Sequence, residues 1–213
     1  MSAVAGSTWE LDISLPQWLE VPAGDVGAGV VTGVGTGVGT GVDIEQWRAD
    51  VAAVFTLLEE VDSQLGDDAP HNGLALDIPR AIDGLLEFSA TLPDGHHIVA
   101  GLALPGRWPL PVVIAVTPTD ESYDLLAAAG ARGGSPIEAP TVDYLPEELG
   151  DGVRVTRLDL DDDGAVWATV GCARRAAGLD TVLTWRTTEL DLVPSFSPYL
   201  ESLVGSVRVG SAE

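Results

Sequence analysis

The chain has 213 residues, 46% of them apolar, and its 33 Asp and Glu residues oppose 10 basic residues for a net charge of −23. This composition is typical of a folded protein, and this charge repels nucleic-acid phosphates and anionic lipid head groups, so we expect neither as a partner. All ten basic residues are Arg, which excludes lysine Schiff-base chemistry and a P-loop nucleotide site.

From the sequence we expect neither an export signal nor a membrane-spanning helix. The N-terminal residues "MSAVAGSTWELD" contain no basic region and no apolar run, so we expect no signal peptide. No stretch approaches the roughly 18 consecutive apolar residues of a membrane-spanning helix. Cys172 is the single cysteine, so no intrachain disulfide can form. We expect a cytoplasmic protein.

The first predicted element is a half-buried strand in "WELDISL", residues 9–15. Trp9, Leu11 and Ile13 alternate with polar residues, which is the period of a strand with one buried face. The following "LPQWLEVP", residues 15–22, places Trp18 between two prolines.

Residues 23–43 are predicted to form a low-complexity Gly/Val/Thr connector. Glycine occupies every odd position from Gly33 to Gly41, whereas a dinucleotide fingerprint needs glycines at i, i+2 and i+5. The i+5 position here always holds Val or Thr, so that fingerprint cannot fit. A strand built from this tract would regain nearly the same face after a four-residue slip, so its pairing would be poorly specified. We favour a variable connector; a functional extended strand is the alternative.

A helix is predicted over residues 44–65. Asp43 is a suitable N-cap, and Gln46 follows three residues later as in a capping box. Gly66 is a suitable stop. The apolar residues fall at helical spacing on one face: Ile44, Trp47, Val51, Val54, Phe55, Leu58, Val61 and Leu65.

The middle of the chain is predicted to contain a hairpin, a strand, a short helix and a loop. Residues 86–104 show apolar alternation on both sides of the turn "PDG", which is typical of a hairpin. Residues 112–116, "VVIAV", predict a buried strand, and "DESYDLLAAAGA" predicts a short helix that ends near Gly130. Residues 131–152 are rich in Gly and Pro and are expected to form a long surface loop.

The C-terminal third is predicted to contain three strands, "VRVTRLDL", "AVWATVGCA" and "TVLTWRTT", followed by an amphipathic helix. The helix carries one continuous apolar stripe: Phe196, Tyr199, Leu200, Leu203, Val204 and Val207. The elements together predict an α+β fold in which a mostly antiparallel sheet of six to seven strands is packed by two or three helices. We expect residues 1–213 to form one such domain.

The segment "DLDDDGAVWATV" is the clearest candidate for a metal site. Asp159, Asp161 and Asp163 occupy the first, third and fifth positions of a calcium loop, and Gly164 occupies the sixth. The twelfth position, where a bidentate Glu is required, holds Val170, and both flanks alternate as strands do. We favour an ordinary hairpin turn, with a calcium site at the three aspartates as the alternative.

Histidine and cysteine offer little for catalysis. His96 and His97 begin a predicted strand, so their side chains point to opposite faces and make a poor joint metal site. Cys172 lies in a predicted strand beside Arg174 and Arg175, which would lower its pKa, but we favour a buried structural thiol. We predict no cofactor.

Six tryptophans are many for a chain of this length. Trp18 and Trp108 each lie next to prolines, and we consider both as exposed anchors for a protein partner. The remaining four lie on predicted inner faces and are expected in the core: Trp9, Trp47, Trp167 and Trp185.

The lead segment "LPQWLEVP" and the tail "TVLTWRTTELDLVPSFSPYLESLVGSVRV", residues 181–209, resemble the corresponding parts of PsbP-like α/β/α sandwich proteins. The tail also resembles the closing strand and helix of small actinobacterial proteins of unknown function. The resemblance covers the first and last parts of the chain and implies an antiparallel sheet between helices, with an accessory or binding role and no catalysis. It transfers no functional residue to this sequence.

These observations favour a non-enzymatic accessory protein that binds a protein partner with a basic surface, as an immunity protein or a secretion accessory would. One alternative is an enzyme with a carboxylate-lined pocket, which requires Asp120, Glu121 and the Asp161 turn to converge in one cleft. The other alternative is the calcium-binding module at Asp159, Asp161 and Asp163.

Overall fold

The structure is a computed structural model of the chain and describes residues 9–13, 17–22, 29–33, 43–64, 76–104 and 109–209. The strands are β1 (Trp9–Ile13), β2 (Trp18–Val21), β3 (Gly29–Gly33), β4 (His96–Gly101), β5 (Leu110–Pro118), β6 (Thr141–Tyr144), β7 (Asp151–Leu160), β8 (Val166–Ala176), β9 (Leu179–Thr187) and β10 (Val207–Val209). The helices are α1 (Ile44–Gln64), α2 (Ile78–Ala90), α3 (Leu125–Ala128), the 3-10 turn η1 (Glu147–Leu149) and α4 (Leu192–Gly205).

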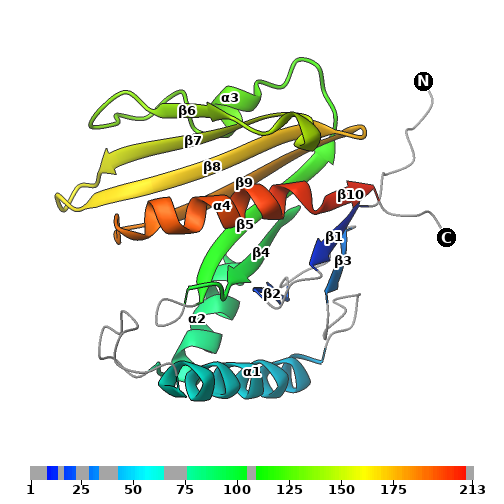
Figure 1. Ribbon diagram of the computed structural model, residues 1–213, viewed down its shortest axis with the longest axis vertical. Coiled ribbons are helices and arrows are strands. Elements are labelled where there is room, and N and C mark those ends of the chain that lie inside the picture. The colour runs from blue at the N-terminus through cyan, green and yellow to red at the C-terminus, as the bar shows by residue number, and fades with distance from the viewer. Residues whose placement is uncertain are drawn as a thin grey trace.

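One large antiparallel sheet organises the molecule (Figure 1). Its seven strands run in the order β2-β4-β5-β9-β8-β7-β6, and a smaller sheet has the order β10-β1-β3. The helix α4 lies along one face of the large sheet, and α3 lies behind the opposite face. The predicted α+β fold with a mostly antiparallel sheet is therefore confirmed, and the sheet lies between helices as in a sandwich.

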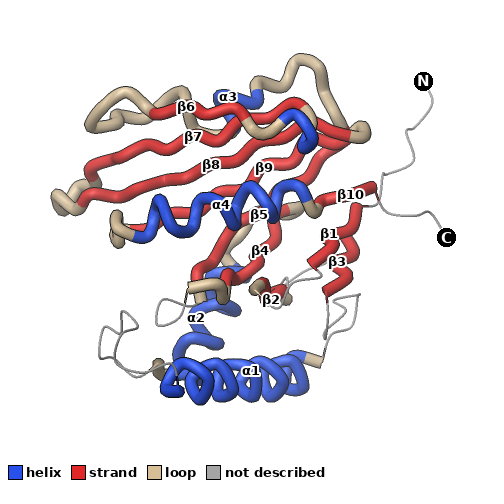
Figure 2. Tube along the Cα trace, viewed as in Figure 1, coloured by secondary structure: helices blue, strands red, loops and turns tan. Residues whose placement is uncertain are grey.

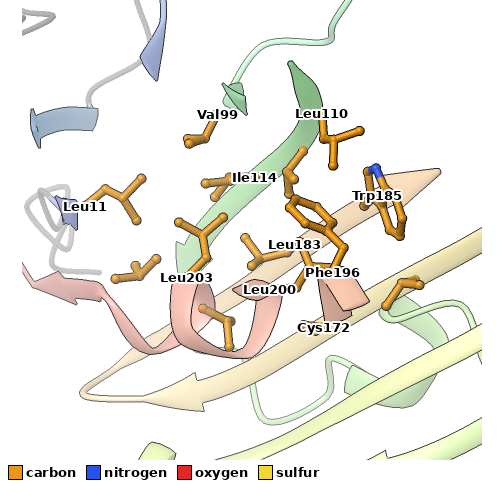
Figure 3. Packing of buried hydrophobic residues seen from close by; sticks show 14 of the residues in the cluster. Leu11, Val99, Leu110, Ile114, Cys172, Leu183, Trp185, Phe196, Leu200 and Leu203 are labelled. Carbon is orange, nitrogen blue, oxygen red and sulfur yellow. The ribbon is translucent and has the colours of Figure 1, made fainter. Parts of the chain in front are cut away.

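The largest part of the core lies between α4 and the sheet (Figure 3). Phe196 is fully buried, with its ring centroid 4.7 Å from that of Trp185 and 5.7 Å from that of Trp18. The predicted stripe of α4 is buried at Phe196, Leu200, Leu203 and Val204. Val207, which the sequence placed on the helix, instead belongs to β10, where it pairs with β1. The C-terminal helix thus joins the large sheet to the small one.

The longest helix, α1, packs against α2, and both helices share a core cluster with β2 and β4 on the face of the sheet opposite α4. Its first turn is capped as predicted, because the Asp43 carboxylate accepts hydrogen bonds from the backbone N–H groups of Glu45 and Gln46 at 3.0 and 3.2 Å. Only part of the predicted stripe is buried, since Trp47, Val51 and Phe55 are inside while Ile44, Val54 and Val61 are exposed. In the ranges that the structure describes, no helix combines the length and the apolar character needed to cross a membrane.

The predicted hairpin at 86–104 is wrong in its first half, where α2 replaces the expected strand. Asp77 caps the helix by accepting a hydrogen bond from the Arg80 N–H at 3.2 Å, and a proline occupies the first turn. Ile82, Leu85 and Ser89 are buried at helical spacing. The alternation of Leu86, Phe88 and Ala90 that suggested a strand spans only five residues, which is too short to distinguish the two periods.

Two segments that the sequence treated as irregular contain strands. Within the connector predicted at 23–43, β3 pairs in parallel with β1, with Leu11 opposite Val31. Residues 34–42 of the glycine tract lie outside the described residues. Within the loop predicted at 131–152, β6 pairs with β7 and η1 follows it. Pairing with a neighbouring strand explains both, because that neighbour supplies the hydrogen bonds that a four- or five-residue strand cannot supply alone.

Candidate binding surface

The segment with the candidate calcium ligands Asp159, Asp161 and Asp163 forms a tight hairpin turn between β7 and β8. The carboxylate of Asp161 accepts hydrogen bonds from the Ala165 N–H at 2.7 Å, the Trp167 indole at 2.8 Å and the Asp163 N–H at 3.0 Å. The Trp167 hydrogen bond, followed by the Ala165 N–H, lowers the pKa of Asp161. Internal hydrogen bonds therefore occupy this carboxylate, as an ordinary hairpin turn requires.

Asp159 also forms an ion pair within the protein. Arg157 binds it with two parallel hydrogen bonds of 2.6 and 2.7 Å, and this pairing lowers the pKa of the Asp159 carboxyl. The same guanidinium donates to the carbonyls of Gly130 and Gly133 at 3.3 Å. In the described part of the chain, no three His, Cys, Asp or Glu side chains gather as a metal site would need.

The acids proposed for an enzymatic cleft lie at opposite ends of the sheet. Asp161 adjoins the start of β8, whereas Asp120 accepts a hydrogen bond through its carbonyl from Arg175, near the end of β8. Eleven residues of β8 put these two ends roughly 30 Å apart. Arg175 also donates hydrogen bonds of 2.6 and 2.8 Å to the carboxylate of the buried Asp180. At the Asp120 end of β8, Arg175 therefore fixes the loop between β5 and α3.

The burial of the tryptophan side chains differs in part from the prediction. Trp18 is half-buried against Phe196 instead of projecting as an anchor, and Trp108 lies outside the described residues. Trp167, expected in the core, is half-buried with the Arg186 guanidinium 4.5 Å from its ring centroid. Trp9, Trp47 and Trp185 are core residues as predicted.

His96, His97 and Cys172 lie where the sequence suggested. His97 faces the small sheet, where its ring centroid is 5.1 Å from that of Trp9, and His96 lies on the other face of β4. Cys172 is fully buried, and burial raises the pKa of its thiol to about 12 despite the neighbouring Arg154. A thiol with this pKa stays protonated and is a poor nucleophile near neutral pH.

The most distinctive surface is the outer edge of β6, which we call the β6 edge (Figure 2). β6 is the last strand of the large sheet, and the strands in the described ranges pair with it only from the β7 side. The Leu145 N–H donates to the Gly152 carbonyl at 3.0 Å, so Asp143 and Thr141, two and four residues earlier, also form the hydrogen-bonded pairs with β7. The backbone N–H and C=O groups of Val142 and Tyr144 consequently point outward.

One face of the β6 edge carries apolar side chains. Val142 and Tyr144 lie opposite Val155 and Val153, two buried residues of the cluster beneath α3. Tyr144 is 80% exposed and Val142 is 39% exposed. The apolar rows under α3 therefore continue to the open edge of the sheet and end there uncovered.

The other face of the β6 edge carries a row of alternating charge. Glu201 of α4 pairs with Arg154 of β7, and Arg154 pairs at 2.7 Å with Asp143, whose side chain is 47% exposed. Beside this row lies a groove of about 250 Å³, lined by Glu138, Ala139, Thr141, Thr156, Arg157, Leu158, Leu190, Val193 and Pro194. The exposed acids Glu147 and Glu148 of η1 follow directly after β6.

Sequence reasoning missed this surface because it assigned residues 131–152 to a loop. The alternation in "TVDY", residues 141–144, was a signal, but four residues are too few to predict a strand. Only the pairing with β7 reveals that this segment ends the sheet.

No protein-family model and no curated protein matches the chain. Among solved structures, a crystal structure from Bacteroides thetaiotaomicron VPI-5482 is similar at a TM-score of 0.37 and 7% identity, over 56% of this chain and 40% of that one. The Saccharomyces cerevisiae Ran-binding protein Mog1p is similar at a TM-score of 0.36 and 11% identity, over 55% of this chain and 80% of that one. At these TM-scores neither likeness carries an argument about this chain.

Proposed function

We propose that the protein is a non-enzymatic accessory protein that binds a protein partner with a basic surface, as an immunity protein or a secretion accessory would. The observation that carries this proposal is the β6 edge, where exposed apolar side chains and unpaired backbone groups are flanked by carboxylates. Exposed apolar side chains rimmed by polar residues are typical of interaction surfaces. The net charge of −23 favours a cationic partner.

The environments of the reactive residue types support binding over catalysis. Asp159 and Asp180 are held by arginines, Asp161 is held by its own turn, and Cys172 is buried as a neutral thiol. Each of these groups has a structural task that explains its position and its pKa.

Affinity capture from the native host at two ionic strengths tests this proposal. We expect a discrete basic protein to be retained at about 50 mM salt and largely released at about 200 mM, because charge attraction between surfaces is screened within a Debye length. The control is an unrelated protein of similar size and net charge. Retention of the same proteins by both baits would mean that only general charge attraction was measured, and would contradict the proposal.

A further inference from the structure

We infer that the partner is bound by strand addition at the β6 edge, and that the bound segment is an extended one in which basic and apolar residues alternate. This inference rests on the proposed function and specifies its surface and its partner chemistry.

The backbone of β6 is ready to pair on its outer side. Val142 and Tyr144 direct their N–H and C=O groups away from β7, so an incoming strand would find two donors and two acceptors at the spacing of a β ladder. An extended peptide bound in this way gains affinity from main-chain hydrogen bonds and specificity from alternate side chains.

The two faces of β6 specify those alternate side chains. On one face, Val142 and Tyr144 end the apolar rows that begin at Val155 and Val153, so an apolar residue of the incoming strand would continue the row. On the other face, Asp143 is the last residue of a row of alternating charges and pairs with Arg154. An Arg or Lys of the incoming strand would therefore continue this row beside Asp143.

A second copy of the chain is the competing occupant of an open strand edge. The charge argues against it, because each copy carries −23 and the acids Glu138, Glu147 and Glu148 flank the edge. Two such edges brought together would place like charges opposite each other, whereas a basic segment would be attracted over a distance of about one Debye length, roughly 30 Å at 0.01 M salt.

The test uses the full chain and a synthetic peptide of about eight residues, a typical strand length, in which Arg alternates with Val. A peptide of identical composition with the arginines grouped at one end is the control. Residue-resolved hydrogen exchange is the readout. We expect the alternating peptide to slow exchange of the Val142 and Tyr144 amides by about tenfold or more at saturation, because they become hydrogen-bonded, and to leave the Asp143 amide unchanged.

Variants separate the backbone and side-chain contributions. Val142→Pro removes an outward N–H without removing a bond to β7, and Val142→Thr is its control with the amide retained. Tyr144→Ala cannot disturb the core, because that side chain is 80% exposed. We expect Val142→Pro and Tyr144→Ala each to weaken peptide binding by about tenfold, as loss of a central contact does.

Two double variants test the contribution of the acidic side chains. Glu147→Gln with Glu148→Gln should weaken peptide binding severalfold more at low salt than Glu59→Gln with Glu60→Gln, a matched pair of adjacent glutamates on the distant α1. Equal effects of the two pairs would show attraction by net charge alone, and would overturn the proposed site.

The outcomes also distinguish this inference from the proposed function. If neither peptide slows the two amides, or if the chain dimerises through β6 instead, strand addition to a basic segment is wrong. If the host partner is captured equally by wild type, Val142→Pro and Tyr144→Ala, the protein still binds a partner, but not at the β6 edge. Loss of capture in both variants, with Val142→Thr unaffected, supports the inference.

Discussion

Glu20 is the residue whose placement departs most from its ordinary chemistry. It lies on β2 opposite Val99, is only 7% exposed, and its Oε2 has no hydrogen-bond partner among the described groups. Burial raises the pKa of this carboxyl from 4.5 to about 9, so it is neutral in the folded protein at pH 7. In the unfolded chain the same carboxyl is ionised at pH 7.

We therefore expect Glu20→Gln to stabilise the protein at neutral pH. Wild-type stability is full below the unfolded pKa of 4.5 and falls as pH rises from there to about 9, because only the unfolded state releases the proton in this window. At pH 7 the gain should be on the order of 3 kcal/mol. Urea unfolding at pH 5 and pH 8 measures it, with the exposed Glu87→Gln as a control. A Gln variant that is no more stable than wild type at pH 8 would show that Glu20 is solvated or paired.

The Asp161 turn should not bind calcium. Its carboxylate already accepts hydrogen bonds from Ala165, Trp167 and Asp163, and Asp159 is held by Arg157. Calorimetric titration should therefore give no dissociation constant below about 1 mM, the weak end of the range for calcium modules. Tighter binding that is lost in Asp161→Asn would restore the calcium hypothesis.

At the scale of elements, α4 should decide whether the protein folds. Its buried face packs on β8 and β9, and Phe196, Leu200 and Leu203 belong to one core cluster with Leu11 of the small sheet. We expect a chain that ends at Pro194 to lose cooperative melting, and Phe196→Ala to cost about 3–5 kcal/mol of unfolding free energy. The exposed Ser202→Ala is the control. A cooperative melt in the shortened chain would mean that the core lies elsewhere.

The glycine tract should tolerate shortening. Deleting residues 36–39 regenerates the same pattern of Gly, Val and Thr, and loop length enters stability only logarithmically, so the melting temperature should change by no more than about 2 °C. Differential scanning calorimetry of the two chains provides the comparison. A fall of many degrees would favour the alternative that the tract forms an ordered strand.

The elements also differ in how well their sequences predicted them. β7, β8, β9 and α4 are long and strongly periodic, and all four lie where the pattern placed them, except that Val207 belongs to β10 and not to α4. The segment of α2 shows both helical spacing and a short alternation, and the hairpin turn "PDG" biased the choice towards a strand. Only packing against α1 and β4 resolves such a segment, because local periods within five residues overlap.

At the scale of the whole molecule, the charge of −23 should oppose compactness as well as attract partners. The Debye length, beyond which charge–charge repulsion is largely screened, falls from about 30 Å in 0.01 M sodium chloride to about 8 Å in 0.15 M. We expect the melting temperature to rise by a few degrees over this range and to rise equally with potassium chloride. An unchanged or falling melting temperature would indicate that arginine pairs such as Arg175–Asp180 outweigh the general repulsion.

The fold class, the three consecutive strands β7, β8 and β9, the buried stripe of α4 and the burial of Cys172 could all be predicted from the sequence, because each depends on local period and on burial of apolar side chains. Only the three-dimensional structure shows that residues 141–144 end the sheet, that Glu20 of β2 is buried, and that the candidate acids lie at opposite ends of β8. These outcomes depend on which strand lies beside which. Strand neighbours are set by contacts between residues far apart in the chain, and no local pattern records them.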